Sequence, residues 1–375
     1  MIYYGLARSA QELAAAQTLA ARVFGEILAL DPIAQVENKA LLWNEPRGAP
    51  LVVVAVLDDG RVVGVARLLK RTLGRGGQTF HCMGFSSIAV DPSLRGQGLS
   101  GPLMEAALRV AREAGAVVGL LFGRRAVDHY YTRFGFHGLS SYSRLRMRPL
   151  LSGDGVVLRP MLELTDELLF NFQTLHSQCY GSTFGWIERS PEMWRFQLLK
   201  MDRERIDVTV IDWQQRMAGY LIHHGGVIHE IAIAKGVPWE MVLAQVATVT
   251  RQETLVVEVP PEHPVLTTLA QLDITLETRQ CDFGGHMVIV LDENKVCQAA
   301  EERVRHNARR AGLAPALESW DGVTIQWDGV EAAVQRTGPM DFPALSRLMG
   351  AKTLTQTTGI LDPALCFHVS MPDHF

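Results

Sequence analysis

The sequence predicts a mixed α/β fold, and three observations support this prediction. Two β-rich runs flank Asp59-Gly60, which is a strong hairpin signal. A glycine-containing loop at 95–98 separates an apolar run from a helical pattern. The chain then repeats part of this order. Because its 375 residues exceed one ordinary core, we expect two or three domains.

The elements of the first unit follow from the spacing of apolar residues. We expect a helix at 8–30, a hairpin at 51–70, a glycine-rich hairpin tip at 72–80, a strand at 81–90, a helix at 99–114 ended by Gly115, a buried strand at 116–122, a short helix within 126–136 and a closing strand at 141–150. These elements together make one mixed sheet with helices, of about one domain's length.

A second unit repeats the first hairpin. Its segment "WQQRMAGYLIH" aligns with "DDGRVVGVARL", which pairs Arg61 with Arg216 and Gly64 with Gly219. Any two hairpins share some features, but the preceding 160–200 is also helical in pattern. The segment that follows the repeated strands, "AKGVPWEMVLAQVA", has no Arg-Gly-x-Gly. The second unit is therefore predicted to keep the fold and lose the loop.

A third segment begins near Asn294, with a helical pattern that stops at Gly312 and a strand pair around Asp328-Gly329. We therefore divide the chain into domains at 1–148, 149–293 and 294–375.

Composition excludes several function classes. The chain is 47% hydrophobic and 20% charged with a net charge of −4, so it has no electrostatic footprint for nucleic acid or a membrane surface. The N-terminus has no signal-peptide pattern, and no apolar run reaches the length of a membrane span. Five scattered cysteines without a CxxC pair favour a reduced, cytoplasmic setting without disulfides or zinc. The histidines at 223, 224 and 229 lack metal-ligand spacing, so no metal is expected.

The loop "VDPSLRGQGLS" is the strongest candidate site. Backbone N–H groups at a helix start are unpaired and suit a phosphate group, and Gly96 and Gly98 allow its close approach. Arg95 would add a charge-assisted contact. The glycines alone are equally consistent with a plain chain reversal. The loop matches neither the Walker pattern nor the dinucleotide fingerprint.

"VDPSLRGQGLSGPLMEAAL" resembles motif A of the GNAT superfamily of N-acetyltransferases, Arg/Gln-x-x-Gly-x-Gly/Ala, through Arg95, Gly98 and Ser100. "HYYTRFGF" resembles motif B of that superfamily through Tyr130, Tyr131 and the Gly135-Phe136 pair. An intact unit, a degenerate copy and a short third segment ending in "MPDHF" are together similar to Eis-like (enhanced intracellular survival) acetyltransferases. The resemblance implies a GNAT fold at 1–148, a degenerate GNAT-like domain, and a small C-terminal α+β domain similar to sterol carrier proteins.

The resemblance also implies a cofactor site for acetyl-CoA, without a metal. The implied cofactor-binding residues are Ile88, Ala89, Val90, Arg95, Gly96, Gln97, Gly98, Leu99, Ser100, Gly101, Ala126 and Val127. The first three lie on the strand before the loop, which splays in this superfamily so that its backbone faces the acetyl-pantetheine. The loop residues would hold the pyrophosphate.

Two residues have catalytic roles by resemblance. Tyr131 corresponds to the general acid, and a phenol is protonated at neutral pH and able to protonate a departing thiolate. Without the motif, a packed aromatic would be the simpler interpretation, which we keep for Tyr130. The carboxylate of Phe375 corresponds to the general base, although a terminal aromatic could instead simply pack as an anchor. Three alternatives for the base are His81, His129 and Asp91.

The predicted function is therefore acetyl transfer from acetyl-CoA to a primary amine, such as a polyamine, an aminoglycoside or a lysine side chain. The resemblance implies a homo-oligomer, a hexamer in members of the family. The alternative is a non-catalytic acyl-CoA sensor or a lipid-binding protein.

Overall fold

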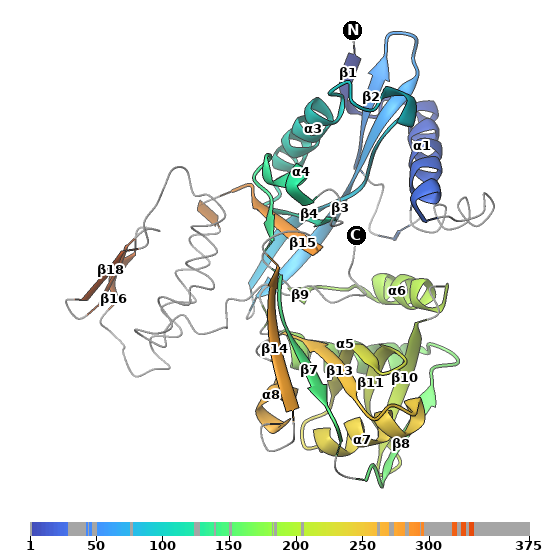
Figure 1. Cartoon of the computed structure of the whole chain (residues 1–375), viewed down its shortest axis with the longest axis vertical. Coiled ribbons are helices and arrows are strands. Elements are labelled where there is room, and N and C mark those ends of the chain that lie inside the picture. Colours follow the sequence, from blue (N-terminus) through green and yellow to red (C-terminus); the bar gives the residue numbers. More distant parts are fainter. Residues whose placement is uncertain are drawn as a thin grey trace.

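Two mixed sheets, each covered by helices, organise the chain (Figure 1). The computed structural model describes residues 2–28, 43, 45–46, 51–75, 78–123, 128–138, 140–149, 152–181, 183, 186–203, 206–260, 263–269, 274–281, 285–292, 294–295, 317–320, 324–327 and 330–333. The predicted mixed α/β class is confirmed.

The first sheet has the order β1-β2-β3-β4-β5-β15-β6. Its strands are β1 (Ile2–Leu6), β2 (Leu51–Leu57), β3 (Val62–Arg75), β4 (Gln78–Val90), β5 (Val118–Gly123), β6 (His137–Gly138) and β15 (Gly285–Val290). Only the β4–β5 pairing in this path is parallel. Helix α1 (Ala10–Leu28) packs on one face, and α3 (Ser100–Glu113) packs on the other (Figure 1). The short helix α4 (Asp128–Thr132) follows β5.

The second sheet has the order β14-β7-β13-β12-β11-β10-β8. Its strands are β7 (Ser140–Met147), β8 (Val156–Pro160), β10 (Asp207–Trp213), β11 (Arg216–His224), β12 (Val227–Ile233), β13 (Leu255–Val259) and β14 (Ile274–Cys281). Helices α5 (Asp166–Tyr180) and α6 (Pro191–Arg203) contribute to the core on one face. Helices α7 (Trp239–Thr250) and α8 (Pro264–Thr268) contribute to the core on the other. β12 and β13 form the parallel pair of this sheet.

The two sheets confirm the repeat read from the sequence. Gly64 pairs with Ala55 beside a bulge in the β2–β3 hairpin, and Gly219 pairs with Ile211 beside a bulge in the β10–β11 hairpin. Each of these hairpins is followed by an antiparallel strand, a helix and a parallel strand. The aligned glycines therefore occupy the same place in both copies of the fold.

The two sheets exchange one strand each, which the sequence did not show. The strand expected to close the first unit, β7, pairs with β13 and β14 in the second sheet. In return β15, which lies beyond the second unit in sequence, pairs with β5 and β6 in the first. Met287 on β15 is buried in the core of the first sheet. Both strands are inserted at the same position of their sheets, so neither sheet is built from one continuous segment.

A further strand joins the two units. β9 (Trp186–Ile187) pairs with β3 at Leu73 and Gly74. The amide of Glu188 donates to the carbonyl of Thr72 at 3.0 Å. A Cβ at Gly74 would stand 1.9 Å from the Trp186 ring, so glycine is needed for this contact. The second unit is therefore hydrogen-bonded to the end of β3 that lies near the β3–β4 turn.

The third segment is described only in part. β16 (Leu317–Trp320), β17 (Thr324–Trp327) and β18 (Val330–Ala333) form a three-stranded antiparallel sheet. This confirms the strand pair expected around 328–329. The resemblance of 294–375 to sterol carrier proteins and the predicted domain boundaries stay predictions. Among the described residues, none of the helices combines the length and hydropathy of a membrane span.

Candidate functional site

The candidate site begins where two parallel strands separate. The last residue pair between β4 and β5 is Phe85 with Leu121. Just beyond it, β4 contains a bulge, because its pairing with β3 passes from Ser86 to Ala89 across a single β3 residue. The bulge residue Ser87 has a φ of 49°. The backbone of Ile88 therefore lies outside both ladders, as expected for a strand that splays.

The loop after β4 carries the glycines that the sequence singled out. Gly96 and Gly98 have φ values of 80° and 78°, where glycine is favoured. A Cβ at either position would meet nothing within 4 Å, so the glycine backbones face open space. Helix α3 begins directly afterwards, and its N-cap residue Leu99 offers no side-chain hydrogen bond. Among the described residues, none accepts a hydrogen bond from the amides of 96–101.

The start of the loop is held in place by Asp91. Its carboxylate accepts from the Ser93 amide at 3.0 Å and the Ser93 hydroxyl at 2.7 Å. It also forms an ion pair with Arg22 of α1 at 3.0 Å. These Ser93 hydrogen bonds, and then Arg22, lower the pKa of Asp91. Asp91 therefore fixes the loop and is a poor general base.

The α4 aromatics pack beside the start of α3. Tyr131 is half-buried against the core below α3, and its ring meets Phe136 edge-on with centroids 6.3 Å apart. Within the described part of the chain, the buried Tyr130 hydroxyl has no hydrogen bond of ordinary geometry. Burial raises the pKa of Tyr130, and the nearby Ser100 hydroxyl and Arg133 partly offset this. The structure thus brings motif B to the helix start at which motif A ends.

Arg133 is a functional candidate that the sequence reasoning missed. Its guanidinium lies over the Tyr130 ring at 4.3 Å from the centroid. The same group would lie 3.3 Å from a Cβ at Gly101 in the first turn of α3. The three-residue spacing of Tyr130 and Arg133 on a helix is the signal that could have shown it. A second cation thus stands beside the loop that carries Arg95.

The structure brings most of the predicted site residues together, whereas others lie outside the described residues or away from the site. Ile88, Ala89, Val90, Arg95, Gly96, Gln97, Gly98, Leu99, Ser100 and Gly101 form one continuous path from the splayed end of β4 into α3. Ala126, Val127 and Phe375 lie outside the described residues. Of the alternative bases, His129 is exposed on α4. His81 lies seven residues before Ile88 on β4, roughly 20 Å away along the strand.

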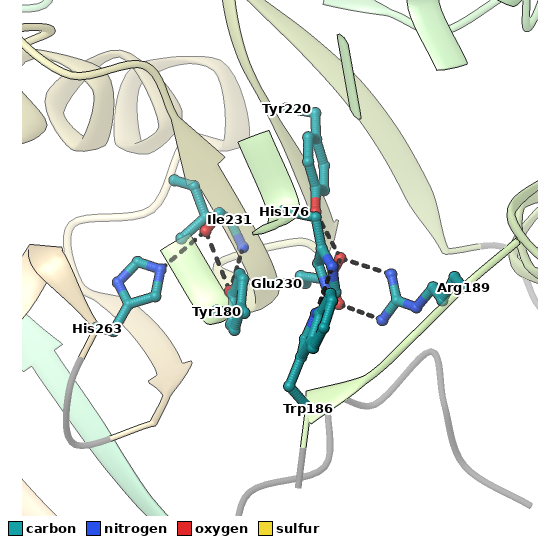
Figure 2. Close-up of polar contacts among 8 residues, drawn as sticks. All are labelled: His176, Tyr180, Trp186, Arg189, Tyr220, Glu230, Ile231 and His263. Atoms are coloured by element: carbon teal, nitrogen blue, oxygen red, sulfur yellow. Dashed lines mark hydrogen bonds and ion pairs between the residues drawn. The ribbon is translucent and has the colours of Figure 1, made fainter. Parts of the chain in front are cut away.

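In the second unit the parallel strands separate in the same way, but side chains there form hydrogen bonds with the backbone. Its parallel pairing ends at Ile228 with Val257. Counting from the residues paired with Gly64 and Gly219, Ile231 corresponds to Ile88. The Ile231 amide donates to the Tyr180 hydroxyl at 3.0 Å, and this hydroxyl donates back to the Ile231 carbonyl at 3.1 Å (Figure 2).

His263 contributes a third bond at this point. Its Nε2 lies 3.0 Å from the Ile231 carbonyl, and its Nδ1 accepts from the Val265 amide at 3.3 Å. The ring is therefore the Nε2–H tautomer. Backbone groups that separation of the strands would leave unpaired are thus satisfied internally.

A buried charged cluster lies beside the hydrogen bonds that Tyr180 and His263 make to Ile231. Glu230 accepts from both terminal nitrogens of Arg189, at 2.9 and 2.7 Å, and from the Tyr220 hydroxyl at 2.8 Å (Figure 2). Burial acts to raise the pKa of Glu230, but Arg189, His176 and the hydrogen bonds together outweigh it and lower that pKa to about 2. Burial and then Arg189 lower the pKa of His176 to about 3, so its imidazole is neutral.

The neutral His176 connects the cluster to the strand between the units. Its Nδ1 accepts a hydrogen bond from the indole of Trp186 on β9 at 2.8 Å. The cluster that fills the second unit therefore also holds the residue that packs on Gly74 of the first. The pairing of Arg189 with Glu230, 41 residues apart, had no sequence signal.

Comparison with known proteins agrees with this geometry. Residues 10–138 match the family model described as an acetyltransferase (GNAT) domain. This part of the chain is similar to GNAT acetyltransferase domains. The match ends at β6, so it contains the splayed strand, the glycine loop and motif B. No curated protein matches the sequence significantly.

Solved structures share the wider fold of the two sheets. A GCN5-related N-acetyltransferase from Kribbella flavida has a TM-score of 0.60 at 16% identity, covering 100% of this chain and 99% of that one. A GCN5-related N-acetyltransferase from Anabaena variabilis has a TM-score of 0.59 at 16% identity, over 80% and 75% of the two chains. Eis1 from Mycobacterium abscessus has a TM-score of 0.56 at 16% identity, over 79% and 76%. At these identities the likeness establishes the fold alone.

Substitution Glu230→Gln should lower the free energy of unfolding by about 3–5 kcal/mol at pH 7, because it leaves Arg189 buried without a counter-ion. The folded pKa of Glu230 is depressed, so its stabilisation is present above the unfolded value of about 4.3 and is lost as pH falls toward 2. The difference between wild type and variant should therefore shrink below about pH 5. Urea unfolding at several pH values measures it, with exposed Glu253→Gln as control. A pH-independent difference would contradict the ionised state of Glu230.

Proposed function

We propose that this protein is an N-acetyltransferase that moves an acetyl group from acetyl-CoA to a primary amine. The observation that carries the proposal is the continuous path from the splayed end of β4 through the glycine loop to the uncapped start of α3. Such a path presents backbone N–H groups to an extended, anionic ligand. The match of 10–138 to the GNAT domain supports the same use.

The residues present fit acetyl-CoA. The open amides of 96–101 would take its pyrophosphate, with Arg95 and Arg133 supplying positive charge beside them. The backbone at 88–90 would face the pantetheine chain, because Ile88 is paired with neither β3 nor β5. Acetyl-CoA supplies the acetyl group as a thioester. Ala126 and Val127 are proposed as further contacts by resemblance.

The chain's own residues must carry out two proton transfers and stabilise one developing charge. Backbone amides beside the β4 bulge would stabilise the carbonyl oxygen as negative charge grows on it. Tyr131, half-buried next to the core, would donate its phenolic proton to the leaving thiolate. The Phe375 carboxylate would accept a proton from the attacking amine. We further propose that the second unit does not bind the cofactor, because Tyr180 and His263 occupy the backbone of Ile231.

Acetyl-CoA should raise the melting temperature of the full chain, and CoA should be released when a suitable amine is added. The measurement is a thermal shift followed by a CoA-release screen with polyamines, aminoglycosides and lysine peptides. Binding of acetyl-CoA without release by any amine would favour an acyl-CoA sensor. Absence of a shift would remove both the enzyme and the sensor, and leave a lipid-binding protein.

Substitution Tyr131→Phe should reduce kcat by about 10²–10⁴-fold, because the ring is kept and the proton donor is removed. The thermal shift by acetyl-CoA should stay close to that of wild type. Tyr3→Phe, which removes a hydroxyl bonded to the Leu6 carbonyl outside the site, is the matched control. A Tyr131→Phe variant with full kcat would end the general-acid role.

Extension of the chain beyond Phe375 should lower kcat if the terminal carboxylate is the base, because the extension converts that carboxylate into an amide. The rate of CoA release by chains with zero, one and three added glycines measures the effect. Full activity in the extended chains would exclude this base and favour His129.

A further inference from the structure

Strand β3 carries two buried arginines on the face that α1 covers. Arg67 and Arg71 are 3% and 5% exposed, and they lie on the same face because strand residues alternate. Val65 belongs to this face, since it packs with α1 in one core cluster. Buried arginines are rare unless each is paired, so this pair requires an explanation.

The carboxylate of Glu45 lies beside both guanidinium groups. Glu45 accepts a hydrogen bond from Arg71 at 2.9 Å and forms a second close ion pair with it. The nearest Glu45 oxygen stands 3.7 Å from Arg67, beyond hydrogen-bonding distance. Among the residues that the structure describes, none accepts a hydrogen bond from the buried Nε of Arg67. Arg67 also lies over the Trp43 ring at 5.4 Å, which contributes attraction but no acceptor. Arg67 is thus a desolvated cation with an unused donor.

The electrostatics agree with this geometry. Burial lowers the pKa of Arg67 to about 10, Glu45 opposes this effect, and Arg71 adds to it. At neutral pH the Arg67 guanidinium stays charged, so a cation whose counter-ion stands 3.7 Å away lies in a low-dielectric place. Such a site favours a further anion.

Arg67 stands next to the proposed reaction centre. It pairs directly with Ser86 on β4, one residue before the bulge and one residue after the last β4–β5 pair. Its side chain is on the α1 face, whereas Lys70 on the same strand is exposed on the opposite face. An anion held by Arg67 would therefore lie beside the separated end of β4.

The second unit shows that the fold does not need an arginine here. Counting from Gly64 and Gly219, the position of Arg67 is occupied by Ile222, which is 1% exposed in an apolar core. The copy that keeps the glycine loop thus has a cation at this position, and the copy that lost the loop has a hydrocarbon. This difference between the copies indicates that Arg67 serves the candidate site and is not needed to form the sheet.

We propose that Arg67, assisted by Arg71, is a carboxylate-binding subsite for the acceptor, so that the acetylated amine belongs to a molecule that also carries a carboxylate. This rests on the proposed N-acetyltransferase function and narrows its substrate. A carboxylate would pair with Arg67 through charge-assisted hydrogen bonds that include the unused Nε. A polyamine or an aminoglycoside brings only positive charge to this place and is disfavoured.

The first test compares carboxylates with their amides. Full-length protein is assayed for CoA release with ω-amino acids from glycine to 6-aminohexanoate, and with the amide of each. The amide has the more readily neutralised amine, so any preference for the carboxylate must come from the protein. We expect at least one member to exceed its amide tenfold or more in kcat/KM.

The second test removes the cation. Arg67→Ile copies the second unit and should abolish the preference by lowering kcat/KM for the carboxylate at least tenfold, with little effect on the amide. Arg67→Lys should restore part of it. Lys70→Met, on the same strand but the opposite face, should change neither. Equal loss for carboxylate and amide would show a structural role and overturn the proposal, as would equal wild-type rates for both.

A binding measurement separates this proposal from the proposed function. Isothermal calorimetry of the same amino acids, with CoA present, should show binding to wild type that weakens at least tenfold in Arg67→Ile. Binding of this kind without any turnover would reject the transferase function and keep the subsite. Turnover of amides, with carboxylates neither binding nor reacting, would reject the subsite and keep the transferase. An unchanged thermal shift by acetyl-CoA verifies that the variant folds.

Discussion

The separation of two parallel strands is the constraint on which the rest of this structure depends. When pairing stops at Phe85 and Leu121, backbone N–H and C=O groups of β4 lose their neighbours within the sheet. Buried groups of this kind must find other partners. The two halves of the chain meet the requirement in different ways. The second half supplies Tyr180 and His263 from within. The first leads its backbone into an open glycine loop, where we propose that the ligand binds.

The same fold is present in two copies, and each copy satisfies the backbone at the separated strands in its own way. The copies agree in strand order and in the bulge beside the aligned glycines. They differ at the loop, at Arg67 against Ile222, and in the charged cluster around Glu230. The copies are also tied together, because β7 and β15 are exchanged and Trp186 packs on Gly74. The second half therefore completes the sheet of the first and holds one end of β3.

Much of the candidate site could be predicted because it is local in sequence. The glycines between a strand and a helix predict the loop from Arg95 to Gly101, and the aromatic motif predicts Tyr131. Arg67 could not be predicted in this way, since a lone arginine in a β-rich run reads as an exposed residue. Its burial depends on Trp43 and Glu45, more than twenty residues earlier in the chain.

By itself, the sequence determined the mixed α/β class, the repeat and the loss of the loop in the second copy. These features are encoded by short-range patterns: hydrophobic period, turn residues and glycine positions. Only the tertiary structure decided which strands complete which sheet, what fills the second copy, and which charges are buried together. Strand exchange leaves no mark on local periodicity, because β7 presents the same alternation to either sheet. Buried ion pairs such as Arg189 with Glu230 arise from long-range packing, whose residues are scattered along the chain.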